Sequence, residues 1–218
     1  QTYFTAEELK NAIEGLPEKE VFASGVGAVS IENPVRRTEG RMVPLTEIRQ
    51  ISEYCKSKGI PMHLDGARIF MTAAWSGVSV KEYAAYFDTV YISLYKYFGA
   101  AGGAILCGSS QLIDQMPHQI KIHGGTVFGS WVNAAMALHQ MEGFEERLKE
   151  AIKRATLIFE RINKIPGLKV SPLDGGTNIY SFDIGGGING KTLQQKLFQE
   201  HQLRIIPPNE KGKTTLTV

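Results

Sequence analysis

Two segments of the sequence combine charged side chains with small or aromatic residues in patterns that could support chemistry. The first, His63-Leu64-Asp65-Gly66-Ala67-Arg68, places a carboxylate at the end of an apolar run and an arginine three positions later. The second, Ser93-Leu94-Tyr95-Lys96-Tyr97-Phe98-Gly99, places a lysine among aromatic residues and ahead of a glycine-rich turn. A lysine held in an apolar pocket has a lowered amine pKa and becomes a nucleophile for carbonyl groups.

Each segment also has an ordinary structural interpretation. Asp65 and Arg68 could form an ion pair that only stabilises the fold, and Lys96 could be a solvated surface residue, as most lysines are. Together, however, the two segments suggest the pairing that pyridoxal phosphate requires. A lysine forms an imine with the cofactor's aldehyde, and a carboxylate keeps the pyridine nitrogen protonated so that the ring can accept electrons.

The elements around these segments alternate between strands and helices, which predicts a mostly parallel α/β sheet. In such sheets ligands bind outside the carboxyl ends of the strands, where Asp65 and Lys96 are expected. The predicted strands cover residues 28–31, 60–64, 88–94 and 103–107. The predicted helices run from a Thr5 capping box to Pro17, and over residues 45–58, 69–75, 79–85, 130–138 and 144–162.

The last fifty residues suggest a second unit. Strands are expected near residues 178–183 and 203–206, with a helix near 192–200, and residues 166–172 are the best candidate boundary. We therefore expect residues 1–165 to belong to a large domain and residues 166–218 to begin a smaller C-terminal α+β domain.

Further motifs strengthen the cofactor hypothesis. With the two segments above, Ser30-Ile31-Glu32-Asn33, Gly40-Arg41-Met42-Val43-Pro44-Leu45 and His123-Gly124-Gly125 closely resemble the low-specificity threonine aldolases, from about Val21 to the end. These enzymes form part of the β-eliminating lyase group of fold type I pyridoxal phosphate enzymes. The resemblance implies a three-layer, aspartate-aminotransferase-like large domain. It also implies cleavage of L-threonine or L-allo-threonine to glycine and an aldehyde by a retro-aldol reaction.

The resemblance implies a role for each matching residue. Lys96 matches the lysine that forms the imine, and Asp65 matches the carboxylate that pairs with the pyridine nitrogen. Arg68 matches an arginine that binds the substrate's carboxylate, for which a planar and permanently charged fork is well suited. Ala67 or Gly66 would lie under the cofactor ring, where a larger side chain would collide with it.

Three further positions have weaker assignments. His63 could tune the surroundings of the ring or act as an acid or base, although a histidine that ends a buried strand is often a satisfied core group. Ser93 could reach the cofactor phosphate because it precedes Lys96 by three residues. Gly124 matches a glycine-rich loop near the cofactor, and an ordinary turn is the alternative.

The sequence also departs from the family pattern. Asn33 is followed by Pro34-Val35-Arg36-Arg37 where the family usually has a histidine, and Phe128 stands where an arginine often reaches a phosphate in the neighbouring subunit. A second carboxylate-binding arginine, expected near the C-terminus, is replaced by residues 211–215. The family's phosphate-cradling region would lie before Gln1, so we expect an N-terminal part to be missing. These departures leave two alternatives open, β-elimination from another amino acid and a non-catalytic relative.

Composition excludes several classes of protein. The formal charge is +2 and the basic residues are scattered, which argues against a nucleic-acid-binding protein. The apolar fraction of 43% and charged fraction of 21% are typical of a folded, water-soluble chain, and no apolar run is long enough to span a membrane. No Gly-x-Gly-x-x-Gly joins a strand to a helix, which argues against a nicotinamide-binding domain.

Two expectations concern surroundings and assembly. Cys55 and Cys107 form no metal-binding motif, so we expect free, buried thiols in a reducing, cytoplasmic compartment. The family resemblance implies a homodimer or homotetramer with active sites at the subunit interface.

Overall fold

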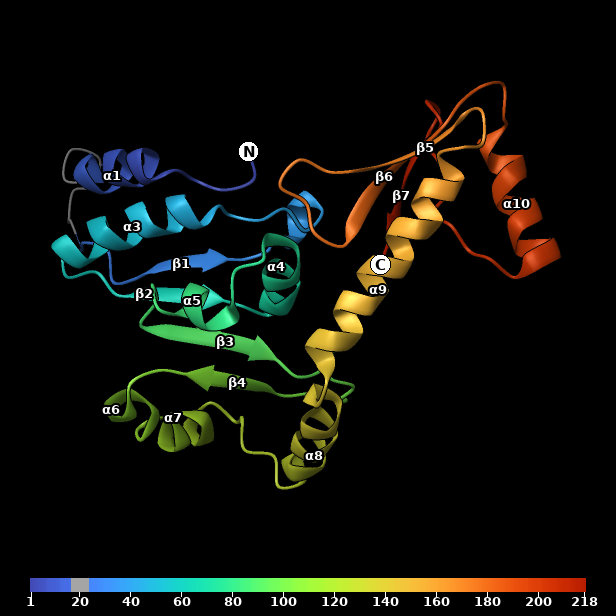
Figure 1. Cartoon of the computed structure of the whole chain (residues 1–218). Helices are drawn as coiled ribbons and strands as arrows, with labels where there is room; N and C mark the ends of the chain where they lie inside the picture. Colours follow the sequence, from blue (N-terminus) through green and yellow to red (C-terminus); the bar gives the residue numbers. More distant parts are fainter. Residues whose placement is uncertain (17–23) are drawn as a thin grey trace.

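The computed structural model describes residues 1–16 and 24–218, in which a long helix joins two β-sheets (Figure 1). In the first part of the chain the elements are α1 (Ala6–Glu14), β1 (Val29–Glu32), the 3₁₀ helix η1 (Arg36–Thr38), α3 (Leu45–Ser57), β2 (Met62–Asp65), α4 (Ile69–Ser76), α5 (Val80–Ala84), β3 (Thr89–Ser93) and β4 (Ala104–Cys107). They are followed by α6 (Ser110–Ile113), α7 (Met116–Ile122), α8 (Ser130–Met141), α9 (Phe144–Ile162), β5 (Leu168–Pro172), β6 (Ile179–Ile184), α10 (Gly190–His201) and β7 (Lys213–Thr217).

The larger sheet has the strand order β1-β2-β3-β4. The first three strands are parallel and β4 is antiparallel to β3, which confirms the prediction of a mostly parallel sheet. The register pairs Asp65 with Glu32 on one side and with Tyr91 on the other. The carboxyl ends of β1 and β2 are therefore level, and the loops that follow β1, β2 and β3 meet along one edge of the sheet (Figure 1).

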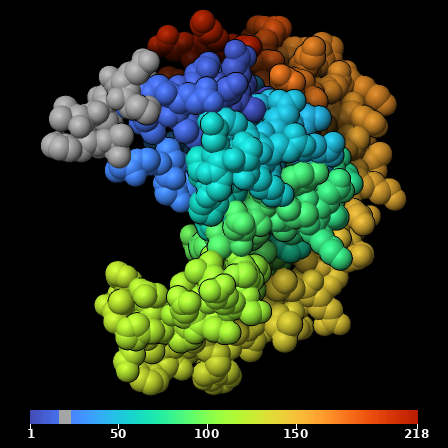
Figure 2. Space-filling model, turned by 90° about the vertical axis from the view of Figure 1, so that its left-hand side faces the viewer, coloured from blue at the N-terminus to red at the C-terminus, as the bar shows by residue number. Residues whose placement is uncertain are grey.

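The two faces of this sheet differ because successive side chains on a strand point in opposite directions. One face packs against α3, α4 and α5 in a core that includes Ile31, Ile48, Leu64 and Ile69. The other face carries polar side chains that remain exposed or half-buried, namely Ser30, Glu32, His63, Asp65, Thr89 and Tyr91. Figure 2 shows a hollow on this side of the molecule, between the blue N-terminal part of the chain and the yellow-green lobe that contains α6 and α7.

The smaller sheet has the order β5-β6-β7, with both pairs of strands antiparallel. Its core includes Val170, Phe182 and Ile184, and Leu193 of α10 and Phe159 of α9 pack against it. The last part of the chain therefore forms an α+β unit. The domain division at residue 165 stays a prediction, since α9 runs continuously from the large sheet's helices to this unit (Figure 1).

One secondary-structure prediction is wrong. Residues 203–206 form no strand, because the carbonyl oxygens of Ile205 and Ile206 accept hydrogen bonds from the side chains of Gln194 and Thr214, at 3.2 and 2.8 Å. The two prolines that follow also lack the N–H groups that a strand needs. Strand β5 begins within the expected boundary at residues 166–172, and that boundary stays a prediction.

The Thr5 capping box is present: the Thr5 hydroxyl accepts a hydrogen bond from the Glu8 N–H, and the Glu8 carboxylate accepts one from the Thr5 N–H. Pro17, the expected end of this helix, lies outside the described residues.

Cys55 is buried, as predicted, but the prediction for Cys107 is wrong. All four residues of β4 are exposed, whereas β1, the other edge strand of the sheet, has two buried residues. Of the helices in the described ranges, none is both long and apolar enough to cross a membrane.

Candidate active site

The predicted cofactor carboxylate stands at the last position of β2. Asp65 is half-buried, and its Oδ1 atom accepts a hydrogen bond from the backbone N–H of Ala67 at 3.1 Å. In residues 1–16 and 24–218 no donor is hydrogen-bonded to the second carboxylate oxygen. The local turn thus orients the carboxylate and leaves one oxygen for a further N–H donor.

A buried hydrogen bond joins the Asp65 loop to the Lys96 loop. Ser93, at the end of β3, is completely buried and donates its hydroxyl proton to the carbonyl oxygen of Ala67 at 3.0 Å. The structure thus shows a structural role for this hydroxyl. The role of Ser93 as a phosphate ligand stays a prediction.

Lys96 lies three residues beyond the end of β3 and is half-buried. Its Nζ atom is 5.4 Å from the ring centroid of Tyr95, and no carboxylate of the described chain lies within ion-pair distance of it. The loop is anchored by Phe98, which is 1% exposed and makes edge-to-face contacts with Phe70 and Phe144 at centroid distances of 5.3 and 4.9 Å. The lysine is therefore unpaired and sits on a loop that is fixed by aromatic packing.

Arg68 pairs with Glu32, not with Asp65. Its Nη1 atom is 4.0 Å from Glu32 Oε1, and both side chains are mostly buried. The guanidinium also lies beside Tyr97, where burial raises the pKa of the phenol and the positive charge of Arg68 opposes that rise. The alternative of an ion pair between Asp65 and Arg68 is therefore not observed, and the Asp65 carboxylate remains available.

His63 and Asp65 lie on the same face of β2 because they are two residues apart. The Nδ1 atom of His63 is 2.8 Å from the Thr89 hydroxyl, so one ring nitrogen is satisfied within the sheet. Tyr91 shares this face. Burial raises the pKa of its phenol, and the nearby Tyr95 and Asp65 raise it further. The open face thus holds a row of polar groups, and a catalytic role for His63 stays a prediction.

Gly124 follows α7, whose C-cap is His123, and has a φ of 71° that favours glycine. It is exposed, and α6 and α7 lie beyond β4 at the edge of the sheet (Figure 1). Among the residues that the structure describes, no hydrogen bond connects Gly124 with the Asp65 or Lys96 loops. The predicted place of Gly124 near the cofactor stays a prediction.

The lysines of residues 211–215 lie at the wrong end of the small sheet to replace the second arginine. β7 pairs Lys213 with Asp183 and Thr217 with Ile179. The Ile179 end faces the large sheet, since neighbouring Tyr180 accepts a hydrogen bond from the Trp75 indole at 3.0 Å. Lys213 instead lies 3.5 Å from the Asp183 carboxylate at the far end.

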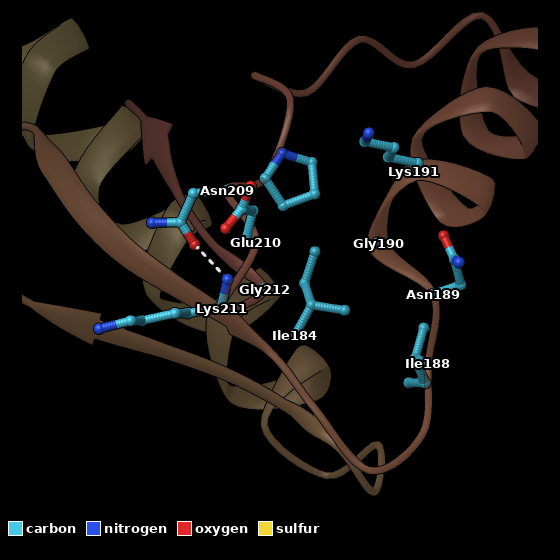
Figure 3. Close-up of a pocket in the computed structure, with 10 residues that line it drawn as sticks. Ile184, Ile188, Asn189, Gly190, Lys191, Asn209, Glu210, Lys211 and Gly212 are labelled. Carbon is cyan, nitrogen blue, oxygen red and sulfur yellow. Dashed lines mark hydrogen bonds between the residues drawn. The ribbon is translucent and has the colours of Figure 1, made fainter.

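A cavity of about 820 Å³ lies at that far end and is separate from the strand-end loops. Figure 3 shows Asn189 and Lys191 at the start of α10 on one side, and the turn of Asn209, Glu210 and Lys211 on the other. None of the predicted site residues lines this cavity.

Sequence reasoning missed three residues that shape the site. Glu32 and Tyr97 flank Arg68, and Phe98 anchors the lysine loop. The position of Glu32 at the end of a strand parallel to β2 was a usable signal. The partners of Tyr97 and Phe98 depend on tertiary packing, which spacing along the chain does not reveal.

The residues present fit pyridoxal phosphate. Asp65 has an oriented oxygen that would accept a hydrogen bond from the ring nitrogen, Ala67 would add only a methyl group there, and Lys96 has no ion-pair partner among the described residues. Within residues 1–16 and 24–218, no three His, Cys, Asp or Glu side chains gather as metal ligands would.

The sequence and the fold of the chain are similar to those of known proteins. The family model for β-eliminating lyases matches residues 1–184. The low-specificity L-threonine aldolase of Candida albicans is 34% identical over 64% of this chain and 37% of its own length. The low specificity L-threonine aldolase of Saccharomyces cerevisiae is 34% identical over 62% of this chain and 34% of its own. The crystal structure of a candidate L-allo-threonine aldolase from Listeria monocytogenes covers 99% of this chain and 58% of its own, with a TM-score of 0.76 and 25% identity. The chain thus spans little more than a third of the length of these curated relatives.

Proposed function

Because the chain belongs to the β-eliminating lyase family, we propose that the complete protein is a pyridoxal-phosphate-dependent lyase that cleaves L-threonine or L-allo-threonine to glycine and an aldehyde. The observation that carries this proposal is the arrangement of the strand ends. A carboxylate with a free oxygen ends one strand, a lysine with no ion-pair partner in the described chain follows the neighbouring parallel strand, and a buried hydrogen bond joins their loops.

Each of the chain's site residues has a separate role. When bound, the cofactor supplies an electron-accepting ring, which stabilises the electron pair left when the Cα–Cβ bond breaks. Lys96 holds the cofactor by its amine, and Asp65 accepts the hydrogen bond of the ring nitrogen and keeps it protonated. Arg68 binds the substrate's carboxylate and so orients the bond that breaks. His63 lies on the same face and is our candidate for tuning the ring or moving a proton.

The test is the visible absorbance spectrum of the full-length protein before and after borohydride reduction, followed by peptide mapping. We expect a band that disappears on reduction and a pyridoxyl group on Lys96. In Lys96→Ala both the band and glycine formation from L-allo-threonine should be lost, whereas Lys81→Ala, which removes an exposed lysine of α5, should behave like the parent. An unchanged spectrum in Lys96→Ala would contradict the proposal. Ammonia and a keto acid in place of glycine would indicate β-elimination.

We also propose that the complete protein is a cytoplasmic homodimer or homotetramer with its active sites at the subunit interface. Exposed apolar side chains between residues 122 and 138 support an assembly, because monomeric proteins rarely expose large apolar patches. Ile122, Val127, Phe128, Trp131 and Leu138 are each between 59% and 97% exposed. Light scattering on the full-length protein should give two or four chains, and a monomer would contradict this part of the proposal. Cell fractionation tests the location.

A further inference from the structure

The carboxylate of Glu32 lies beside the guanidinium of Arg68 at the open face of the sheet. β1 and β2 run parallel with Glu32 directly opposite Asp65, so both carboxylates reach the same edge. The Glu32 Oε1 and Arg68 Nη1 atoms are 4.0 Å apart, and the two side chains are only 34% and 22% exposed. The pair is therefore shielded from solvent more than an ordinary surface ion pair.

Glu32 is itself held in place. Its Oε1 atom also accepts a hydrogen bond from the backbone N–H of Arg36 at 3.2 Å, at the first residue of η1. Arg68 also lies near the half-buried phenol of Tyr97, which is next to Lys96 in the chain. The guanidinium is thus near both the end of β1 and the loop that carries the lysine.

This arrangement has an energetic consequence for binding. A free arginine side chain has about 2 kcal/mol of rotamer entropy to lose, and a guanidinium has five N–H donors of which Glu32 can occupy only one edge. An arginine that is already oriented loses less entropy when it binds a carboxylate.

We propose that Glu32 is a positioning residue that orients Arg68 to receive the α-carboxylate of the amino acid. This inference rests on the proposed function. Through Arg68, Glu32 makes the site prefer amines that carry a carboxylate over amines that do not. If Glu32 instead competed with the substrate for Arg68, removing its carboxylate would tighten substrate binding. The two roles therefore predict opposite changes in substrate affinity.

The experiment compares glycine with methylamine, which has the same primary amine without the carboxylate. Each is titrated into the full-length holoenzyme, and the change in cofactor absorbance gives a dissociation constant. The parent should bind glycine more tightly than methylamine. Glu32→Gln should weaken glycine binding roughly five- to tenfold, as expected when one rotamer-rich side chain must be ordered on binding, and leave methylamine within about twofold. With L-allo-threonine, KM should rise while kcat stays within about twofold.

Three variants control for other causes. Glu53→Gln removes the same charge from an exposed position on α3 and should change neither constant. Glu32→Asp keeps the charge on a shorter side chain and should lie between Glu32→Gln and the parent, and it serves as the test if Glu32→Gln does not fold. In an Arg68→Lys background, Glu32→Gln should have no further effect on glycine, because the residue acts through the guanidinium.

The outcomes separate the inference from the function on which it rests. If the parent prefers glycine but Glu32→Gln keeps that preference or strengthens it, the positioning role is overturned and the proposed function stands. If neither amine changes the cofactor spectrum of the parent, the proposed function fails and the inference fails with it.

Discussion

The hydroxyl of Ser93 donates a hydrogen bond to the carbonyl oxygen of Ala67 at 3.0 Å, and this bond joins the loops that carry Lys96 and Asp65. Ser93 is completely buried and Ala67 is 5% exposed, so the bond is shielded from water. The ladder between β2 and β3 ends at the pair of Asp65 and Tyr91, so this side-chain bond lies beyond it. The distance between the two loops is therefore set partly by one side chain.

Ser93→Ala should destabilise the protein, because it leaves the Ala67 carbonyl buried without a partner. We expect a loss of about 1–3 kcal/mol in the free energy of unfolding, measured with urea on cofactor-free protein. Ser57→Ala, which removes a hydroxyl bonded to the Tyr54 carbonyl at an exposed position, should cost less. If stability were unchanged while cofactor affinity fell, the hydroxyl would act as the phosphate ligand that the sequence predicts.

Asp65→Asn should reduce turnover by roughly 100-fold while preserving the fold. The amide oxygen of asparagine can still accept the hydrogen bond from the Ala67 N–H, but the charge that keeps the ring nitrogen protonated is lost. The measurement is glycine formation together with thermal unfolding, with Asp114→Asn at an exposed position as the control. Equal losses of stability and turnover would instead indicate a purely structural role for Asp65.

Patterns along the chain predicted the large sheet well because its signals are local. The apolar runs that became β1, β2 and β3 stand between amphipathic helices, and that alternation indicates a parallel sheet. Asp65 and Lys96 could be placed at strand ends for the same reason. The strand expected at residues 203–206 is absent, since an apolar run has the same sequence pattern whether its carbonyl groups bond to a strand or to the side chains of Gln194 and Thr214.

The contacts that orient the site were less predictable. The Arg68 side chain has two acidic residues on neighbouring strands within plausible reach, and only the tertiary structure shows that it pairs with Glu32. Ser93 had a position suited to a phosphate ligand, but the same position lies beside a carbonyl of the adjacent loop. Spacing thus identifies which residue types meet at an edge, whereas packing decides which atoms bond.

Thr177→Val should loosen the contact between the small unit and the large sheet. Thr177 is 2% exposed and donates its hydroxyl proton to the Gly40 carbonyl at 2.7 Å, across 137 residues of sequence. Valine has nearly the same shape but leaves that buried carbonyl unpaired, so we expect a loss of about 1–3 kcal/mol in the free energy of unfolding.

The matched control is Thr156→Val, since Thr156 bonds the Ile152 carbonyl within the exposed side of α9 and should cost less. Hydrogen exchange provides a second measurement, in which the amides of β6 should lose protection in Thr177→Val and keep it in Thr156→Val. Equal stability of the two variants would show that the bond to Gly40 adds nothing to the docking of the small unit.

Cys55 should make the stability of the protein fall at alkaline pH. Burial raises the pKa of the Cys55 thiol, and nearby Asp88 raises it further, so the thiol stays neutral in the folded state at a pH where it ionises in the unfolded chain. Its contribution to stability is therefore complete below the unfolded pKa of about 8.5 and is lost as pH rises from there through the folded pKa, at no more than about 1.4 kcal/mol per pH unit.

Urea unfolding at pH 8 to 10 should show this slope in Cys107→Ser, which removes the exposed thiol, and a smaller slope when Cys55→Ala is added. Parallel slopes in the two proteins would contradict the assignment, and labelling of Cys55 by a thiol reagent before global unfolding would show that its burial does not protect it.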